Sequence, residues 1–224
     1  SLDRAMPRGW DCFRITWSED RAAVQALEQL NALGFPVHQR PGAVQHCADL
    51  TEGFDGYLKS LSHNARKSLA KRFRMAESLA PRLETVVDGA GVDAFFAEFF
   101  PHHMAYWEKE PGGSYFRHAE ERAFIVAWCK TLLRSGNLVM DRLMLGDACA
   151  NMTVGVAMGT SFHWLLTINT GAHINATPGM VALYLGMQQM SGRGSTRFNL
   201  GPGDYFYKRQ VANAPIPCHD LIVC

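Results

Sequence analysis

The strongest candidates for chemistry lie in one short segment near the C-terminus. A turn, Gly201-Pro202-Gly203, ends a β-type run and is followed at once by four reactive or polar side chains: Asp204, Tyr205, Tyr207 and Lys208. Glycine lets a backbone turn tightly or approach a ligand closely, because it has no Cβ. Binding residues often collect on such loops, which rigid elements hold in place. The same pattern also fits an ordinary turn with solvated polar residues, so both interpretations stay open here.

A second candidate site lies in the loop over residues 169–180. Thr177 is a suitable helix N-cap and Pro178 suits the first helical position. A helix that begins directly after a strand and a loop favours phosphate, because free backbone N–H groups and the positive end of the helix dipole meet there. A well-capped helix that binds nothing is the structural alternative.

A basic helix face is the third candidate. In the helix expected within residues 54–80, Lys67, Lys71 and Arg74 fall on one face, and Arg66 and Arg72 flank them. Such a face is usually solvated, but it would also suit a phosphorylated ligand or an acidic partner.

Composition narrows the class of protein. The chain of 224 residues is 47% hydrophobic and 19% charged, which describes a globular protein with a real core. A formal net charge of +1 argues against general nucleic-acid affinity, which needs an excess of Lys and Arg. No apolar run is long enough to span a membrane, and the N-terminus lacks the apolar core of a signal peptide. The chain does not begin with Met, and we expect it to be trimmed from a longer one.

The cysteines and histidines do not predict a metal site. The six cysteines are scattered, with no C-x-x-C pair, and indicate reduced thiols of a cytoplasmic protein. The adjacent His102 and His103 would point about 100° apart on a helix, so they would not converge on one metal ion.

Hydrophobic periodicity supplies the elements that must position these groups. The helical segments predicted from the sequence are 18–33, a short and a longer helix within 54–80, 92–103, 121–132 and 178–189. Pro101 should kink or break the fourth of these, because proline removes an interior hydrogen bond. The face formed by Val92, Phe95, Phe96 and Phe99 indicates core packing rather than a ligand site.

Period-two alternation predicts strands between these helices. The central region reads as three antiparallel strands: 138–145, the run around Met152 to Met158, and Phe162 to Ile168. Phe162, Trp164, Leu166 and Ile168 are expected to share one apolar face of the last strand. Further extended segments are expected at 42–50, 83–87, 196–200 and 216–223.

From residue 83 onward, the order of elements is strand, helix, helix, three antiparallel strands, helix, strand, loop, strand. This order resembles the GNAT acyltransferase fold, with a mixed, largely antiparallel central α/β sheet flanked by helices. Three segments extend the resemblance, over roughly residues 50–210, to the CelD-like (cellulose-biosynthesis-type) GNAT acetyltransferases, which are relatives of the Fem aminoacyl transferases. They are the run Tyr57–Glu77, the helix start Thr177-Pro-Gly179, and Asn199–Lys208, which is similar to a Gly-x-Gly-Asp-x-x-Tyr-Lys signature.

The resemblance implies an enzyme that uses acetyl-CoA as co-substrate, and it implies a domain division. Relatives of this kind often carry two GNAT-like halves, so residues 1–50 would be the remnant of a first half and 51–224 the acyltransferase domain. The chain departs from standard GNAT enzymes in one respect. Their Arg/Gln-x-x-Gly-x-Gly/Ala pyrophosphate loop is absent, and only Gly171 and Gly179 stand in the corresponding region.

Under this resemblance, each candidate residue receives a hypothetical role. Asp204 is the first choice for the base or amine-orienting carboxylate, and His173 is the second, because imidazole titrates near neutral pH. Tyr205 or Tyr207 would protonate the leaving thiolate. Lys208 would bind a phosphate or pair with Asp204.

Donor and acceptor contacts complete the prediction. N–H groups around Gly179 would hold the CoA diphosphate, and the edge of strand 162–168 would pair with the pantetheine arm. The residues assigned to the cofactor in this way are Leu166, Ile168, Asn175, Thr177, Gly179, Met180, Val181 and Lys208. Arg66 and Trp107 are assigned to the acceptor, which is a small-molecule or sugar amine, although core packing explains the aromatic residues near Trp107 better. No metal is expected.

Two other classes of protein remain open at this stage. A Fem-like transferase would use aminoacyl-tRNA, and the basic face at Lys67, Lys71 and Arg74 is the feature that favours it. A non-catalytic GNAT-like module would bind a small ligand only, and the missing glycine-rich loop favours that reading. The oligomeric state cannot be read from the sequence.

Overall fold

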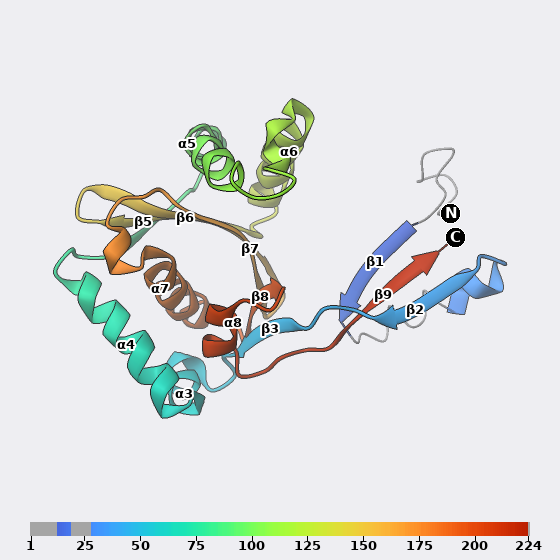
Figure 1. Cartoon of the computed structure of the whole chain (residues 1–224), viewed down its shortest axis with the longest axis horizontal. Coiled ribbons are helices and arrows are strands. Elements are labelled where there is room, and N and C mark those ends of the chain that lie inside the picture. Colours follow the sequence, from blue (N-terminus) through green and yellow to red (C-terminus); the bar gives the residue numbers. More distant parts are fainter. Residues whose placement is uncertain (1–12, 19–27, 224) are drawn as a thin grey trace. The chain divides into compact units, whose positions relative to one another are not determined.

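The structure, a computed structural model, describes residues 13–18 and 28–223 (Figure 1). The chain forms two compact units. We call residues 48–200 the sheet unit and residues 1–47 with 201–224 the terminal unit. Each unit is described by itself below.

The strands form two sheets. Their bounds are β1 Phe13–Ser18, β2 Val37–Pro41, β3 Gln45–Asp49, β4 Arg82–Thr85, β5 Leu138–Leu145, β6 Ala148–Met158, β7 Ser161–Asn169, β8 Arg197–Pro202 and β9 Cys218–Val223. The larger sheet has the order β3-β8-β7-β6-β5-β4, and the smaller has the order β1-β9-β2. Strands β4 to β7 are antiparallel neighbours, whereas β7 and β8 are parallel. This is the mixed, largely antiparallel sheet flanked by helices that the sequence predicts.

The helices follow the predicted order closely. Their bounds are α3 Gly53–Ser60, α4 His63–Glu77, α5 Gly89–Trp107, α6 Ala119–Arg134, α7 Pro178–Gly192 and α8 Phe206–Val211, with short 3₁₀ turns η1 Tyr115–Arg117 and η2 Ile174–Ala176. Caps explain several of the starts. Ser62 Oγ accepts from Ala65 N at the start of α4, and Asp88 Oδ1 accepts from Gly91 N at the start of α5.

Most differences from the sequence prediction have local causes. Pro101 does not break α5, which continues to Trp107, because a proline in an exposed turn removes only one hydrogen bond from a helix held by its packed face. The polar turn was expected to lead directly into a strand, but residues 206–211 form the extra helix α8. Strands β1 and β2 were not predicted. Of the predicted helix 18–33, residues 28–32 are helical, Ser18 ends β1, and 19–27 lie outside the described residues.

Helices cover both faces of the sheet in the sheet unit (Figure 1). Helices α5 and α6 pack on one face of β5 to β7, which we call the apolar face. Helix α7 packs on the opposite face, which we call the polar face, and α4 packs on α7. The two faces therefore meet different partners although the same strands supply them.

The apolar face contains the main hydrophobic core. The aromatic stripe predicted for α5 is buried there, and Phe95, Phe96 and Phe99 pack against one another and against Phe116. Met140, Met152, Val154 and Ile168 of the strands complete this core. Burial of so much apolar surface is the main source of stability in this unit.

The polar face carries buried hydrogen-bonding side chains. Asn151 donates from its amide to Asn169 Oδ1 at 2.8 Å and to Thr167 Oγ1 at 3.1 Å, and it accepts from Thr153 Oγ1 at 3.0 Å. Buried polar groups need such partners, because an unpaired one loses its hydration without compensation. These residues form a satisfied network beneath the start of α7.

A second buried group on this face is Asp141. Burial raises the pKa of its carboxyl, and a hydrogen bond donated by Thr85 Oγ1 at 2.5 Å opposes that shift. The Gln189 amide of α7 lies beside the same carboxylate. The group thus connects β4, β5 and α7.

A β-bulge in β7 changes which residues face which helix. Trp164 is opposite Gly155 and Leu166 is opposite Val154, so Leu165 is an extra residue in β7. Before the bulge, Trp164 faces α7, where a Cβ on Gly186 would lie only 2.9 Å from its ring. After the bulge, Leu166 and Ile168 pack in the core under α5 and α6. The expectation that these four alternating residues share one face was therefore wrong, because the extra residue reverses the alternation.

The terminal unit contains the small sheet. Its last strand, β9, pairs antiparallel with both β1 and β2. Arg40 lies opposite Asp220 in this sheet, and its Nε donates to the buried carboxylate at 3.2 Å. This ion pair connects β2 with β9 across the length of the chain.

Candidate functional site

Strands β7 and β8 separate after a short common stretch. Their register contains only the pairs Ser161–Arg197, Phe162–Phe198 and His163–Asn199, although β7 continues to Asn169. Beyond His163, the edge of β7 that faces β8 is not hydrogen-bonded to it. A strand edge of this kind has N–H and C=O groups that an extended ligand can pair with. The predicted use of this edge therefore has a physical basis.

The loop before α7 contains two residues in a rare backbone conformation. His173 has φ 49° and Thr177 has φ 51°, in the left-handed region that favours glycine. Such a conformation is especially unfavourable for a β-branched residue like Thr177, and strain of this kind is common at ligand sites. Thr177 begins α7 as predicted, but its side chain forms no capping hydrogen bond. Its Oγ1 atom is buried and has no partner among the described residues.

The backbone amides at the start of α7 are not equally available. Met180 N and Val181 N both donate to Thr177 O, at 2.9 and 3.3 Å, and Pro178 has no N–H. Gly179 N forms no hydrogen bond with any residue in the described part of the chain. A Cβ on Gly179 would lie 3.3 Å from Asn169 Oδ1, so the helix start rests closely on the polar network.

The remaining residues assigned to the cofactor lie around this loop and strand. Asn175 is exposed in η2, whereas Met180 and Val181 have buried side chains. Leu166 and Ile168 point into the apolar face, so only their backbone can serve the free edge of β7. His173 is exposed next to η2. All of these residues belong to the sheet unit.

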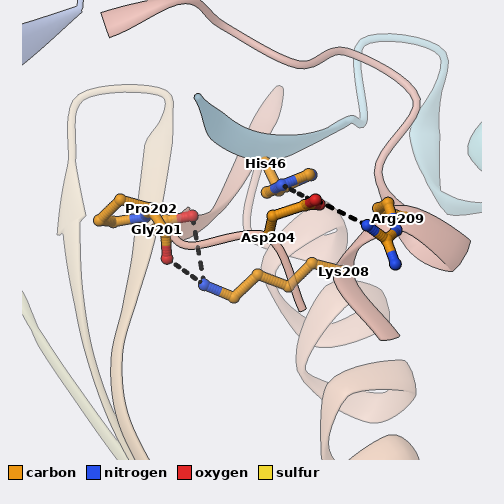
Figure 2. A network of polar contacts seen from close by, with 6 residues as sticks. All are labelled: His46, Gly201, Pro202, Asp204, Lys208 and Arg209. Carbon is orange, nitrogen blue, oxygen red and sulfur yellow. Dashed lines mark hydrogen bonds and ion pairs between the residues drawn. The ribbon is translucent and has the colours of Figure 1, made fainter. Parts of the chain in front are cut away.

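The terminal unit brings together a different polar cluster (Figure 2). Asp204 accepts from Arg209 Nη1 at 2.6 Å, and its second oxygen lies 3.7 Å from His46 Nε2. The carboxylate remains largely exposed, whereas His46 is buried. Asp204 therefore has a cation on one side, an imidazole on the other, and an open approach for a substrate.

Lys208 is not the partner of Asp204 (Figure 2). Its side chain is only 5% exposed, and its ammonium donates to Pro202 O at 2.6 Å and Gly201 O at 3.3 Å. It also lies 5.3 Å from the centre of the Tyr205 ring. Burial lowers the pKa of Lys208. These contacts connect Lys208 to the carbonyl groups of the glycine turn, in place of the predicted pair with Asp204.

The two tyrosines lie side by side. The rings of Tyr205 and Tyr207 are stacked at 6.2 Å, with Tyr205 exposed and Tyr207 half-buried. Burial, and in second place the neighbouring Tyr205, raise the pKa of Tyr207. A phenol is already protonated at neutral pH, and the raised pKa makes Tyr207 a weaker acid than a free tyrosine.

The two residues assigned to the acceptor are not brought together. Arg66 is exposed on α4, on the polar side of the sheet, and Trp107 ends α5 on the apolar side (Figure 1). The exposed basic residues of α4 include Lys67, Lys71 and Arg74, as the periodicity predicts.

Sequence reasoning missed His46. It lies in β3 next to the apolar residues Cys47 and Ala48, and no spacing relates it to Asp204, which is more than 150 positions away. The strained backbone of Thr177 was also invisible, because threonine is an ordinary N-cap. The sequence signal that bears on Thr177 is the absence of the Arg/Gln-x-x-Gly-x-Gly/Ala loop. Without these glycines, other residues have to take up the backbone conformations of the loop.

The described residues form neither a metal-binding cluster nor a membrane-spanning helix. In the described part of the chain, no three His, Cys, Asp or Glu side chains come close enough together to hold a metal ion. None of the helices formed by the described residues combines the length and the apolar character needed to cross a membrane.

Comparison with known families agrees with this architecture. The family model for the acetyltransferase (GNAT) domain matches residues 63–209, which is well over half of the chain. The chain therefore belongs to the GNAT acetyltransferase domain family. No curated protein sequence matches it.

Solved structures share the fold over most of the chain. The crystal structure of FemX superposes with a TM-score of 0.63 and 11% identity, covering 93% of this chain and 71% of FemX. The structure of L-PGS from Bacillus licheniformis superposes with a TM-score of 0.61 and 10% identity, covering 88% of this chain and 64% of L-PGS. At such low identity, these similarities concern the fold alone.

Proposed function

We propose that this protein is an acyltransferase that moves an acetyl group from acetyl-CoA to an amine. The observation that carries the proposal is the separation of β7 and β8 after three residue pairs, directly beside the start of α7. An opening of this kind offers backbone groups to an extended thioester arm. The membership of the chain in the GNAT acetyltransferase family supports the same reaction class.

The residues at the opening fit a phosphate-bearing carrier. Gly179 N and the buried Thr177 Oγ1 are hydrogen-bonding groups without partners among the described residues, and both lie at the positive end of a helix. An anion placed there would give both groups a partner. In the proposal, these atoms hold the CoA diphosphate and the edge of β7 holds the pantetheine arm.

The reaction itself needs little more than correct placement of its partners. The amine nitrogen forms a bond to the thioester carbonyl carbon, the carbon–sulfur bond breaks, and the sulfur leaves as a thiolate that takes up a proton. Asp204 is proposed to orient the amine and to accept its proton, with His46 as its neighbour. Tyr207 is proposed to protonate the thiolate, because its phenol carries a proton at neutral pH, and Tyr205 is the alternative.

A thermal-shift titration tests the donor. Acetyl-CoA and free CoA should both raise the melting temperature, because a ligand that binds only the folded state stabilises it. A buffer control with adenosine alone should give a smaller shift. If acetyl-CoA and CoA leave the melting temperature unchanged up to millimolar concentration, the proposal is wrong.

Variants of the terminal unit test the acid–base assignment. Asp204→Asn keeps the shape of the side chain but should reduce kcat by at least tenfold, while the affinity for acetyl-CoA stays unchanged. His46→Gln should shift the pH profile of kcat/KM, which a purely structural residue would not do. Asp147→Asn, an exposed aspartate in the β5–β6 turn, is the matched control. Unchanged turnover in Asp204→Asn removes that residue from the mechanism.

A Fem-like reaction, with an aminoacyl group taken from tRNA, is the second candidate. The exposed basic residues Lys67, Lys71 and Arg74 on α4 favour it, as does the common fold with FemX. Binding of tRNA that weakens steeply with salt, without any thermal shift by CoA, would select this alternative.

Two finer assignments belong to the same proposal. The segments 177–179 and 199–208 resemble the CelD-like branch of the family. A cytoplasmic location is proposed because Cys47, Cys129, Cys149 and Cys218 are free thiols.

A further inference from the structure

A cavity of about 230 Å³ lies on the apolar face of the sheet unit. Its walls come from α6, from the 3₁₀ turn η1 between α5 and α6, and from β6 and β7. Pockets for drug-sized ligands are usually larger, so this one suits a small molecule or one end of a larger one. It is distinct from the helix start at Thr177, which lies on the polar face.

The walls of the cavity are largely apolar. Phe124, Ile125 and Trp128 of α6 face Leu165 and Leu166 of β7 across it. Phe124 is 65% exposed and Leu165 is 45% exposed, so the cavity opens to solvent at these residues. Exposed apolar side chains gathered around a pocket are typical of binding surfaces.

One lining residue is charged. Glu121 lies one helical turn before Phe124 and Ile125 on the same stripe of α6. Its carboxylate forms no ion pair or hydrogen bond with any residue that the structure describes. The nearest residue of opposite charge in the chain, Arg122, instead donates to the carbonyl groups of Phe116 and Arg117. Glu121 is exposed, and its carboxylate lies in the first turn of α6, where the helix dipole favours negative charge. Placed at the rim of an apolar cavity, it is complementary to a cation with an apolar body.

The bulge in β7 connects this cavity with the proposed thioester site. Because Leu165 is an extra residue, Leu165 and Leu166 both line the cavity, although successive residues of a regular strand face opposite sides. The strand that forms one wall of the cavity is therefore the strand whose free edge is proposed to hold acetyl-CoA. A group bound in the cavity lies next to that edge.

We infer that this cavity binds the amine acceptor, and that the acceptor is a primary amine carried on a compact aromatic or branched aliphatic body. The body packs against Phe124, Trp128 and Leu165, and the ammonium group pairs with Glu121 when the acceptor binds. This ion pair is a binding contact only: for the transfer, the amine has to leave Glu121 and lose its proton, the step in which Asp204 is proposed to act. The inference rests on the proposed function and adds the substrate class to it. A strongly polar amine, such as an amino sugar, would leave its hydroxyl groups without partners against these walls.

Direct binding measurements by calorimetry test this inference on the whole protein. The probes are phenethylamine, 2-phenylethanol, which has the same body without the charge, and ethylamine, which has the charge without the body. Each is titrated with and without saturating CoA. We expect phenethylamine to bind at least tenfold more tightly than either of the other two.

Variants of neighbouring glutamates provide the control. Glu121→Gln should weaken phenethylamine binding at least fivefold and leave 2-phenylethanol binding unchanged. Glu120→Gln should leave both within twofold, because Glu120 lies in the same helical turn, near the same helix dipole, but does not line the cavity. Equal binding of phenethylamine and 2-phenylethanol, no effect of Glu121→Gln, or no binding of phenethylamine in either condition would overturn the inference.

The measurement separates this inference from the proposed function. Thermal stabilisation by acetyl-CoA without phenethylamine binding overturns the acceptor class alone. Phenethylamine binding that depends on Glu121, without any effect of CoA on the melting temperature, supports the cavity and overturns the proposed donor.

Discussion

The two faces of the sheet in the sheet unit are made by the same strands but have opposite characters. The face under α5 and α6 is packed with aromatic and aliphatic side chains, whereas the face under α7 holds the hydrogen-bonded network around Asn151 and the buried Asp141. The strained Thr177, whose hydroxyl has no partner among the described residues, lies on the side of the network. The apolar face thus provides most of the stability, and the polar face supports the candidate site for the donor.

The division into an apolar face for stability and a polar face for binding has one exception. The cavity beside Glu121 interrupts the apolar face where the bulge of β7 meets α6. A proposed acceptor pocket and a proposed donor site therefore lie on opposite sides of one strand. Two substrates that reach the edge of the same strand from different faces can meet in line, which is a large part of what a transferase must achieve.

The largest effect is expected from the centre of the apolar face. Phe99 is fully buried and packs against the rings of Phe95, Phe96 and Phe116. Phe99→Ala should lower the free energy of unfolding by about 3–5 kcal/mol, because it removes buried apolar surface and leaves a cavity. Urea denaturation measures this change. Tyr106→Ala, at an exposed position of the same helix, should change it by less than about 0.5 kcal/mol, and a similar loss in both variants would contradict the assignment of the core.

Acid should weaken the apolar face through His103. Burial lowers the pKa of this imidazole to about 4, so the unfolded chain binds a proton between about pH 6.5 and 4 that the folded protein does not. The free energy of unfolding should therefore be highest above pH 6.5 and fall by about 1–3 kcal/mol as the pH decreases toward 4.

A pair of variants isolates this contribution. His103 Nδ1 is hydrogen-bonded to Ser114 Oγ at 2.9 Å, and a glutamine at this position can keep a polar contact without titrating. The loss of stability between pH 6.5 and 4 should be smaller in His103→Gln than in the unmodified protein. His102→Gln, at the adjacent and less buried position, should keep the full loss. An identical pH dependence in both variants would show that His103 is not responsible.

A substitution at the start of α7 should raise the free energy of unfolding instead of lowering it. Thr177→Gly relieves the left-handed conformation and removes a buried hydroxyl that no described residue pairs with. This should raise the free energy of unfolding by about 1 kcal/mol. If that hydroxyl serves the donor, the affinity for acetyl-CoA should fall by about tenfold at the same time. His173→Gly relieves a similar backbone conformation without removing a buried hydroxyl, so its acetyl-CoA affinity should stay within twofold. Unchanged acetyl-CoA affinity in Thr177→Gly would show that neither the Thr177 hydroxyl nor its strained backbone contributes to acetyl-CoA binding.

Much of the fold, but less of the site, could be predicted from the sequence. The strand Leu138–Leu145, the hairpin turn at Gly159 and the helix start at Pro178 were predicted correctly, because local periodicity and turn residues determine them. His46 beside Asp204 could not be predicted, because only the tertiary fold brings residues so far apart in sequence together. The bulge at Leu165 was missed for a different reason. Two consecutive leucines fit either face, so the pattern contains no sign of an extra residue.

The bulge itself gives the smallest expected change in stability. Deleting Leu165 would make Leu166 follow Trp164 directly, so that Leu166 and Ile168 keep their place in the apolar core and Thr167 and Asn169 keep theirs in the polar network. The ladder with β6 becomes regular, and the free energy of unfolding should therefore change by no more than about 1 kcal/mol.

Function should respond much more strongly than stability to this deletion. It changes the local twist of β7 at the free edge and removes one of the apolar side chains that line the cavity beside Glu121. We expect phenethylamine binding and acetyl transfer to fall by at least tenfold while the far-UV circular dichroism spectrum stays the same. The matched change, Leu165→Ala, keeps the bulge. The logarithm of its loss of activity should be less than half of that caused by the deletion. A deletion variant that is stable and fully active would mean that the bulge is only a packing irregularity. The proposal that donor and acceptor meet at β7 would then be wrong.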